Sequence, residues 1–62
     1  MPVITFEMTP MRKEQKQEIV KGFTETAVRV TGIPAEAFYV LIHENQEENV
    51  GVGGTLLADM ED

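Results

Sequence analysis

The amino-terminal segment Val3–Met8 alternates between apolar side chains and mainly polar ones. In an extended backbone, Ile4, Phe6 and Met8 lie on one face and the side chains between them lie on the other. A period of two over such a segment is typical of a β-strand that places one face against a core. We therefore predict a first strand over Val3–Met8.

A longer amphipathic segment, Met11–Thr31, follows this strand. Its apolar side chains recur at spacings of three and four, at Ile19, Val20, Phe23, Ala27 and Val30. Such spacing places them on one stripe of an α-helix. Threonine is a good N-cap and proline is favoured at the first helical position, so Thr9 and Pro10 predict where the helix begins. Gly32 followed by Pro34 predicts where it ends.

The second predicted strand, Phe38–His43, is apolar on both faces until its last residue. Strands of this kind are typical of parallel sheets, which are buried on both sides. Two parallel strands joined by one helix form a right-handed βαβ unit, and a single helix covers only one face of the sheet. We therefore expect another subunit to cover the other face and the open edges.

A glycine-dense turn, Val50–Gly54, precedes the short segment Thr55–Leu57. This pattern predicts a short C-terminal hairpin that docks on a neighbouring subunit. The fold class predicted for residues 1–62 is therefore a single α+β domain. It consists of two parallel strands, one amphipathic helix and the hairpin, and it is assembled as an oligomer.

The size and composition of the chain strengthen the expectation of self-association. A chain of 62 residues builds only a marginal core unless disulfides, a metal or oligomerisation add to it. There is no cysteine, which excludes disulfides, cysteine-ligated zinc and thiol catalysis, and one histidine cannot hold a metal alone. With 42% hydrophobic and 26% charged residues the chain is typical of globular proteins. We predict no metal site and a homo-oligomer.

The chain is acidic, with 5 lysines and arginines against 11 aspartates and glutamates and a net charge of -6. This sign is opposite to what binding to a phosphate backbone requires, so nucleic acid is not an expected partner. No apolar run approaches the roughly 20 residues of a membrane span, and the first residues lack the basic segment of a signal peptide. We expect a cytoplasmic protein with no membrane contact.

Pro2 offers chemistry that no internal residue has. If Met1 is removed, as is usual before a small residue, Pro2 becomes the N-terminus and carries a secondary amine. An ordinary α-amino group has a pKa of about 7.7–8, and an apolar pocket lowers this pKa because burial disfavours the ammonium. Such an amine is a general base near neutral pH. The alternative is a Met-Pro start without any catalytic role.

Several motifs support the catalytic interpretation of Pro2. The segment Met1–Phe6, the triplet Glu14–Lys16, Pro34 and the turn Gly51–Gly54 together resemble the 4-oxalocrotonate tautomerase family over essentially the whole chain. The resemblance implies βαβ subunits assembled into homohexamers as trimers of dimers. It also implies cofactor-free keto-enol tautomerisation, in which the amino-terminal proline, Pro2 here, is both general base and general acid.

Three positions depart from the pattern of that family. Its members bind substrate carboxylates with one arginine just before the helix and another at the start of the second strand, and an aromatic side chain before the glycine turn walls the pocket. Here Met11 takes the first arginine position, with Arg12 beside it. Tyr39 takes the second, and Val50 takes the aromatic position. Arg12, Tyr39 and Val50 are therefore the candidate substrate-binding residues, with Arg12 supplied by the same or a neighbouring subunit.

The loss of a carboxylate clamp affects the expected substrate. A planar guanidinium binds a carboxylate through two hydrogen bonds, which neither methionine nor tyrosine can do. This argues against efficient turnover of a dicarboxylate. A solvated Arg12 in the first helical turn and a Tyr39 that serves only as an interface aromatic are the alternatives to their binding roles.

These observations together predict an isomerase for a small 2-hydroxy or 2-oxo unsaturated acid, such as 2-hydroxymuconate. Two alternatives stay open. One is a decarboxylase or hydratase of a small oxo acid that uses the protonated proline, and the other is a non-catalytic oligomeric interaction protein. His43, alone at a strand end, is predicted to be a paired structural residue rather than a base or ligand.

Overall fold

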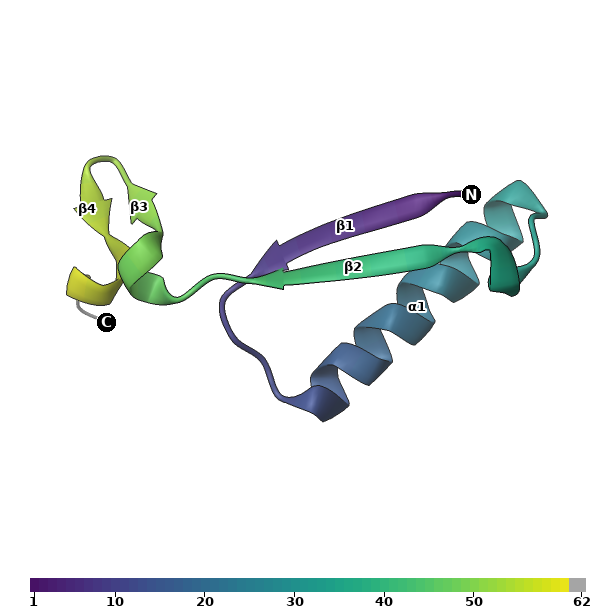
Figure 1. Cartoon of the computed structure of the whole chain (residues 1–62), viewed down its shortest axis with the longest axis horizontal. Helices are drawn as coiled ribbons and strands as arrows, with labels where there is room; N and C mark the ends of the chain where they lie inside the picture. Colours follow the sequence, from purple (N-terminus) through teal and green to yellow (C-terminus); the bar gives the residue numbers. More distant parts are fainter. Residues whose placement is uncertain (61–62) are drawn as a thin grey trace.

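The computed structural model describes residues 1–60 (Figure 1). The strands and helix along the chain are β1 (Val3–Met8), α1 (Lys13–Thr31), β2 (Tyr39–Glu44), β3 (Gly51–Val52) and β4 (Thr55–Leu56). Short 3₁₀ turns lie between and after them, at η1 (Ala35–Ala37), η2 (Glu47–Asn49) and η3 (Leu57–Asp59). This order confirms the predicted α+β arrangement of two long strands, one helix and a C-terminal hairpin.

The two long strands form a parallel sheet. Val3 lies opposite Tyr39 at one end of the sheet, and Met8 lies opposite Glu44 at the other. α1 runs along one face of this sheet, and the antiparallel β3–β4 hairpin projects beyond the carboxyl end of β2 (Figure 1). The two ends of the sheet are therefore far apart and have different neighbours.

The first strand and the end of the helix lie where the sequence predicts them. β1 spans the predicted Val3–Met8. α1 ends at Thr31, and Gly32 follows in the left-handed conformation with φ of 75°, its N–H donating to the carbonyl of Val28. Glycine adopts this backbone conformation without the steric cost that a Cβ imposes, which is why it ends the helix here.

Three predicted boundaries of the helix and the second strand are wrong. The helix begins at Lys13, with Arg12 as its N-cap residue, instead of at Thr9 and Pro10. Residues 9–12 are needed to turn the chain from the end of β1 back across the sheet, so local capping preference does not decide the start. β2 spans Tyr39–Glu44, so it begins and ends one residue later than the predicted Phe38–His43. The Phe38 N–H is not free for the sheet, because it closes the η1 turn by donating to the Ala35 carbonyl.

The apolar core lies between the sheet and α1. Alternate side chains of the strands are half-buried against the helix, namely Ile4, Phe6, Val40 and Ile42. The rings of Phe6 and Phe23 meet edge to face, with centroids 5.4 Å apart and planes at 80°, and this contact ties β1 to α1. No residue among 1–60 is fully buried within the single chain.

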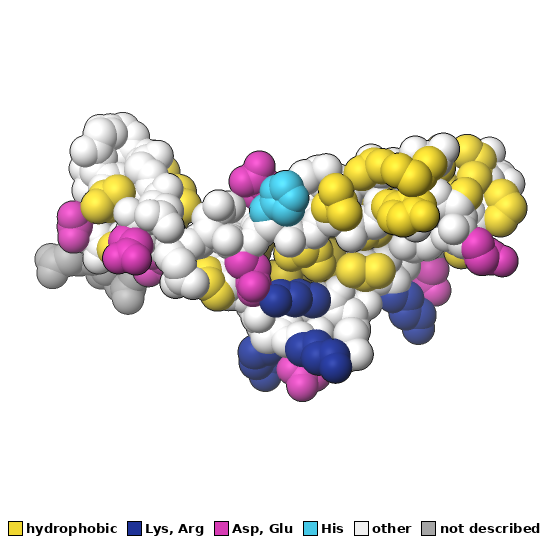
Figure 2. Space-filling model, in the orientation of Figure 1, with side chains coloured by type: hydrophobic (Ala, Val, Ile, Leu, Met, Phe, Trp, Pro, Cys, Tyr) yellow, Lys and Arg dark blue, Asp and Glu magenta, His cyan; other side chains and the backbone are white. Residues whose placement is uncertain are grey.

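The opposite face of the sheet is apolar and uncovered. Val3, Tyr39 and Leu41 point to this side and remain 46%, 52% and 44% exposed. Figure 2 shows hydrophobic side chains gathered over β1 and β2 toward the amino-terminal end of the chain. The sequence predicts that both faces of β2 are buried. Within the chain, α1 covers one of these faces and nothing among the described residues covers the other. Contiguous exposed apolar surface of this kind is typical of an interaction site.

Candidate active site

Pro2 and Tyr39 are neighbours at the amino-terminal end of the sheet. The Tyr39 N–H donates to the Pro2 carbonyl over 3.0 Å, which extends the parallel ladder by one residue. Pro2 is half-buried, whereas the Tyr39 side chain is about half exposed on the open face. The strand pairing therefore brings together two of the four predicted site residues, the base and one candidate binding residue.

Met1 is attached to Pro2 and is 82% exposed. With Met1 in place the Pro2 nitrogen is part of a tertiary amide, which has no basic lone pair. The Met1 side chain contributes little packing, so its removal would leave the strand pairing of Pro2 and Tyr39 in place. The chemistry predicted for Pro2 belongs to the processed chain.

Arg12 lies at the other end of the sheet. β1 has 6 residues and rises about 3.3 Å per residue, so roughly 17 Å of strand separates the two ends. The backbone of Arg12 caps the helix: its carbonyl accepts hydrogen bonds from the N–H groups of Gln15 and Lys16, both at 3.1 Å. Its own N–H donates to the Gln15 side-chain oxygen at 3.1 Å. Arg12 is therefore well placed on α1 but remote from Pro2 of the same chain.

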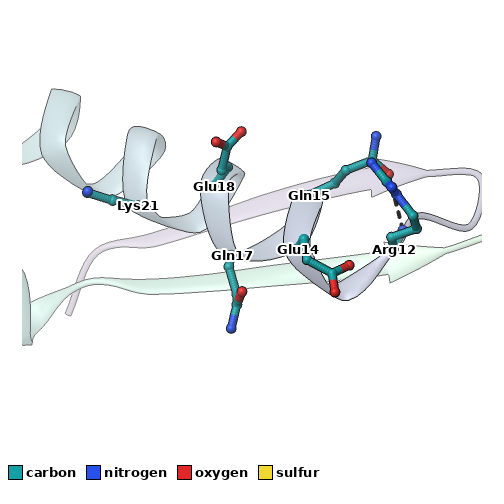
Figure 3. Close-up of a pocket in the computed structure, with 6 residues that line it drawn as sticks. All are labelled: Arg12, Glu14, Gln15, Gln17, Glu18 and Lys21. Carbon is teal, nitrogen blue, oxygen red and sulfur yellow. Dashed lines mark hydrogen bonds between the residues drawn. The ribbon is translucent and has the colours of Figure 1, made fainter.

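The Arg12 side chain borders an open hollow of about 450 Å³ on the first turns of α1 (Figure 3). The residues that line this hollow are Arg12, Glu14, Gln15, Gln17, Glu18 and Lys21. They are polar or charged, and Pro2 is not among them. Neither Pro2 nor Tyr39 lines the hollow, so it is not the pocket predicted around the amine.

Val50 lies beyond the carboxyl end of β2, directly before the hairpin. Its carbonyl accepts a hydrogen bond from the Leu57 N–H at 2.8 Å, which closes the hairpin. Figure 1 shows the hairpin and the N-terminus at opposite ends of the molecule. One chain thus pairs Pro2 with Tyr39 and leaves Arg12 and Val50 away from them.

Glu44 is a structural residue that the sequence analysis did not identify. One of its carboxylate oxygens, Oε2, accepts the Met11 N–H at 2.8 Å and lies 2.9 Å from the Lys16 ammonium. The hydrogen bond from Lys16, followed by that from Met11, lowers the pKa of Glu44 below its ordinary 4.5. The only available signal in the sequence was the acidic residue at the carboxyl end of the second strand. In a parallel βαβ unit the helix begins near this end of the sheet, so an acidic side chain there can reach the first helical turn.

His43 faces the open side of the sheet, opposite Glu7 in the ladder. The Glu7 carboxylate accepts a hydrogen bond from the Asn45 side chain at 3.1 Å.

Among residues 1–60 no three metal-binding side chains gather into one cluster. Within the same part of the chain, no helix has the length and apolar character needed to cross a membrane.

Comparison with known proteins gives one consistent result. The family model for tautomerase enzymes matches residues 2–60. A probable tautomerase of Lactiplantibacillus plantarum is 36% identical over 62 residues, which cover 98% of this chain and 97% of that protein.

Solved structures extend the similarity to the fold. YwhB, a homologue of 4-oxalocrotonate tautomerase, is 36% identical with a TM-score of 0.89, over 97% of this chain and all of that one. DmpI from Archaeoglobus fulgidus is 40% identical with a TM-score of 0.86, over 94% of this chain and all of that one. Sequence and fold agree along nearly the full length, and the family indicated by the motifs is confirmed: the chain belongs to the tautomerase family.

Proposed function

We propose that this protein is a cofactor-free tautomerase in which the Pro2 amine, exposed by removal of Met1, is general base and general acid. The substrate class is a small 2-hydroxy or 2-oxo unsaturated acid, such as 2-hydroxymuconate. The observation that carries this proposal is the position of Pro2: the family match begins at this residue, and β-sheet pairing holds it beside Tyr39.

The proposed reaction moves one proton. The enol O–H of the substrate gives its proton to the Pro2 nitrogen as the carbonyl forms and electrons shift along the conjugated system. The prolinium then returns the proton to a distant carbon, so the amine is regenerated. The base must be neutral at the start, and an apolar environment favours this because it disfavours the ammonium.

The developing dienolate needs hydrogen-bond donors or positive charge. In one chain Tyr39 is the candidate beside Pro2, and Arg12 and Val50 lie too far away. We propose that neighbouring subunits supply them, which makes the complete site a property of an oligomer. The exposed apolar face of Val3, Tyr39 and Leu41 supports such assembly, and a hexamer built as a trimer of dimers is the arrangement we propose.

The proposed site has one guanidinium, that of Arg12. Tyr39 takes the position where the family has its second arginine. A single bidentate partner favours a substrate with one carboxylate close to the reacting carbons. We therefore propose a preference for monocarboxylates over dicarboxylates. The Tyr39 hydroxyl would bind an uncharged oxygen of the substrate.

The test combines the intact mass of the natively produced protein with a tautomerisation assay. Wild type and Pro2→Ala are compared on 2-hydroxymuconate and on its monocarboxylate analogue. We expect loss of Met1, Pro2-dependent turnover and a higher kcat/KM for the monocarboxylate. Retention of Met1 together with turnover that Pro2→Ala does not change would contradict the proposal and favour a non-catalytic interaction protein.

A further inference from the structure

The Glu44 carboxylate joins the end of β2 to the start of α1. Its Oε2 atom accepts the Met11 N–H at 2.8 Å and contacts the Lys16 Nζ at 2.9 Å. Both side chains of the ion pair are 33% exposed, so water screens the charges only in part. One oxygen atom thereby fixes two points of the helix start relative to the sheet.

Arg12 lies between these two points in the chain. Its N–H donates to the Gln15 side chain (Figure 3). Its carbonyl accepts the N–H groups of Gln15 and Lys16. The backbone of Arg12 is therefore part of the first helical turn, and Glu44 anchors that turn on both sides of it. The position from which the Arg12 side chain extends depends on Glu44.

The same contacts leave the Arg12 guanidinium available for an anion. Lys16 and the Met11 N–H hold the pKa of Glu44 below its ordinary value, so this carboxylate is ionised at neutral pH. Within residues 1–60 the ion pair of Glu44 is with Lys16, and no side chain there forms a hydrogen bond or ion pair with the Arg12 guanidinium. Lys16 neutralises Glu44, and the charge of Arg12 is left for a ligand.

We infer that Glu44 is a positioning residue, which together with Lys16 holds Arg12 where it binds a substrate carboxylate. This inference rests on the binding role of Arg12 in the proposed function, and it makes no use of the reacting proton. Glu44 itself does not touch the substrate. Misplacement of a binding group by about 1 Å is enough to weaken its contribution strongly.

The first experiment compares wild type, Glu44→Gln and Lys16→Gln in steady-state kinetics and in NMR titration with hexanoate, an unreactive six-carbon monocarboxylate. We expect the Kd for hexanoate and the KM to rise about 3- to 10-fold in both variants, with kcat within about twofold. Hexan-1-ol has the same length without charge, and its weak binding should not change.

The sign of the effect separates positioning from simple electrostatics. Removal of a negative charge near an anion site tightens anion binding when only long-range charge matters. Positioning requires the opposite result for Glu44→Gln. Glu25→Gln makes the same change of charge on the exposed face of α1 and is the matched control. Binding of hexanoate that is unchanged or tighter in Glu44→Gln overturns the inference.

A double variant tests whether Glu44 acts through Arg12. If it does, Glu44→Gln adds nothing to the weak hexanoate binding of Arg12→Gln, because coupled residues are non-additive. An equal further loss in the double variant overturns the inference. Faster hydrogen exchange of the Met11 amide in Glu44→Gln is the expected local signature. Circular dichroism and the oligomeric state are measured alongside hydrogen exchange, to verify that the variant is folded and assembled.

The outcomes for this inference and for the proposed function are distinct. Turnover that does not depend on Pro2 rejects the proposed tautomerase, while the hexanoate titrations still decide the role of Glu44. Wild-type protein that binds no hexanoate rejects the role of Glu44 even where Pro2-dependent turnover is found.

Discussion

Lys16 and Glu44 form an ion pair with a distance of 2.9 Å between Nζ and Oε2, although they lie on different elements and far apart in the sequence. The pair connects the first turn of α1 to the carboxyl end of β2. The Met11 N–H donates to the same carboxylate oxygen. These contacts fix the path of the chain between β1 and the helix, and with it the position of Arg12.

The stabilising effect of the Glu44 contacts should depend on pH. The pKa of Glu44 is lowered in the folded chain, so its ionised form favours folding above its ordinary pKa of 4.5. This contribution is lost as the pH falls through the lowered pKa. We expect the difference in Tm between wild type and Glu44→Gln to be largest near neutral pH and to shrink below pH 4.5. A difference that stays constant into the acid range would count against the ion pair.

The control for this experiment is Glu25→Gln, which removes the same charge from an exposed position of α1. All proteins are compared at one concentration, because dissociation of an oligomer also shifts Tm. High salt should reduce the effect of Glu44→Gln near neutral pH, since the pair is partly exposed.

Assembly through the open sheet face can be tested at Leu41, which is 44% exposed beside Val3 and Tyr39. We expect Leu41→Glu to shift the protein toward smaller species, because burial of an unpaired carboxylate in an interface is costly. Sedimentation velocity measures the change. Thr26→Glu, on the exposed side of α1, should leave the oligomeric state unchanged. An unaltered assembly in Leu41→Glu would show that this face is not an interface.

The contact of Phe6 with Phe23 is expected to carry much of the packing between β1 and α1. Phe23→Ala removes an edge-to-face partner at 5.4 Å and a half-buried ring. We expect a loss of about 2 kcal/mol in the free energy of unfolding, less than for a fully buried ring. Urea denaturation at fixed protein concentration measures it. Val30→Ala, at a position 71% exposed, should change the stability by less than about 0.5 kcal/mol.

Two glycines of the helical region should respond to alanine with opposite signs. Gly22 lies inside α1, and a Cβ there meets no atom within 4 Å, so Gly22→Ala should stabilise by about 0.5–1 kcal/mol. Gly32 has φ of 75°, which disfavours a Cβ, so Gly32→Ala should destabilise by about 1 kcal/mol. Thermal unfolding of the two variants decides this. Destabilisation by Gly22→Ala would instead indicate a close contact with a neighbouring subunit.

The sequence by itself determined the elements and the family. Apolar residues alternate over Val3–Met8 and recur every three or four residues in the helical segment before Gly32. These spacings predict which face of the strand and of the helix is apolar, because backbone geometry alone sets the direction of each side chain. Capping preference at Thr9 and Pro10 failed to predict the helix start, because it is a local term of about 1 kcal/mol. The path of the chain across the sheet outweighed it.

Only the tertiary structure decided which residues meet. Parallel pairing places Tyr39 against Pro2, while Arg12 lies at the start of α1 and Val50 lies directly before the hairpin, both away from that pair. The sequence signals the Glu44 contacts only by an acidic residue at the end of a strand, because the crossover and not any spacing along the chain brings these atoms together. Local sequence patterns predict the apolar face and the ends of each helix or strand. Contacts between distant segments depend instead on how these elements pack together.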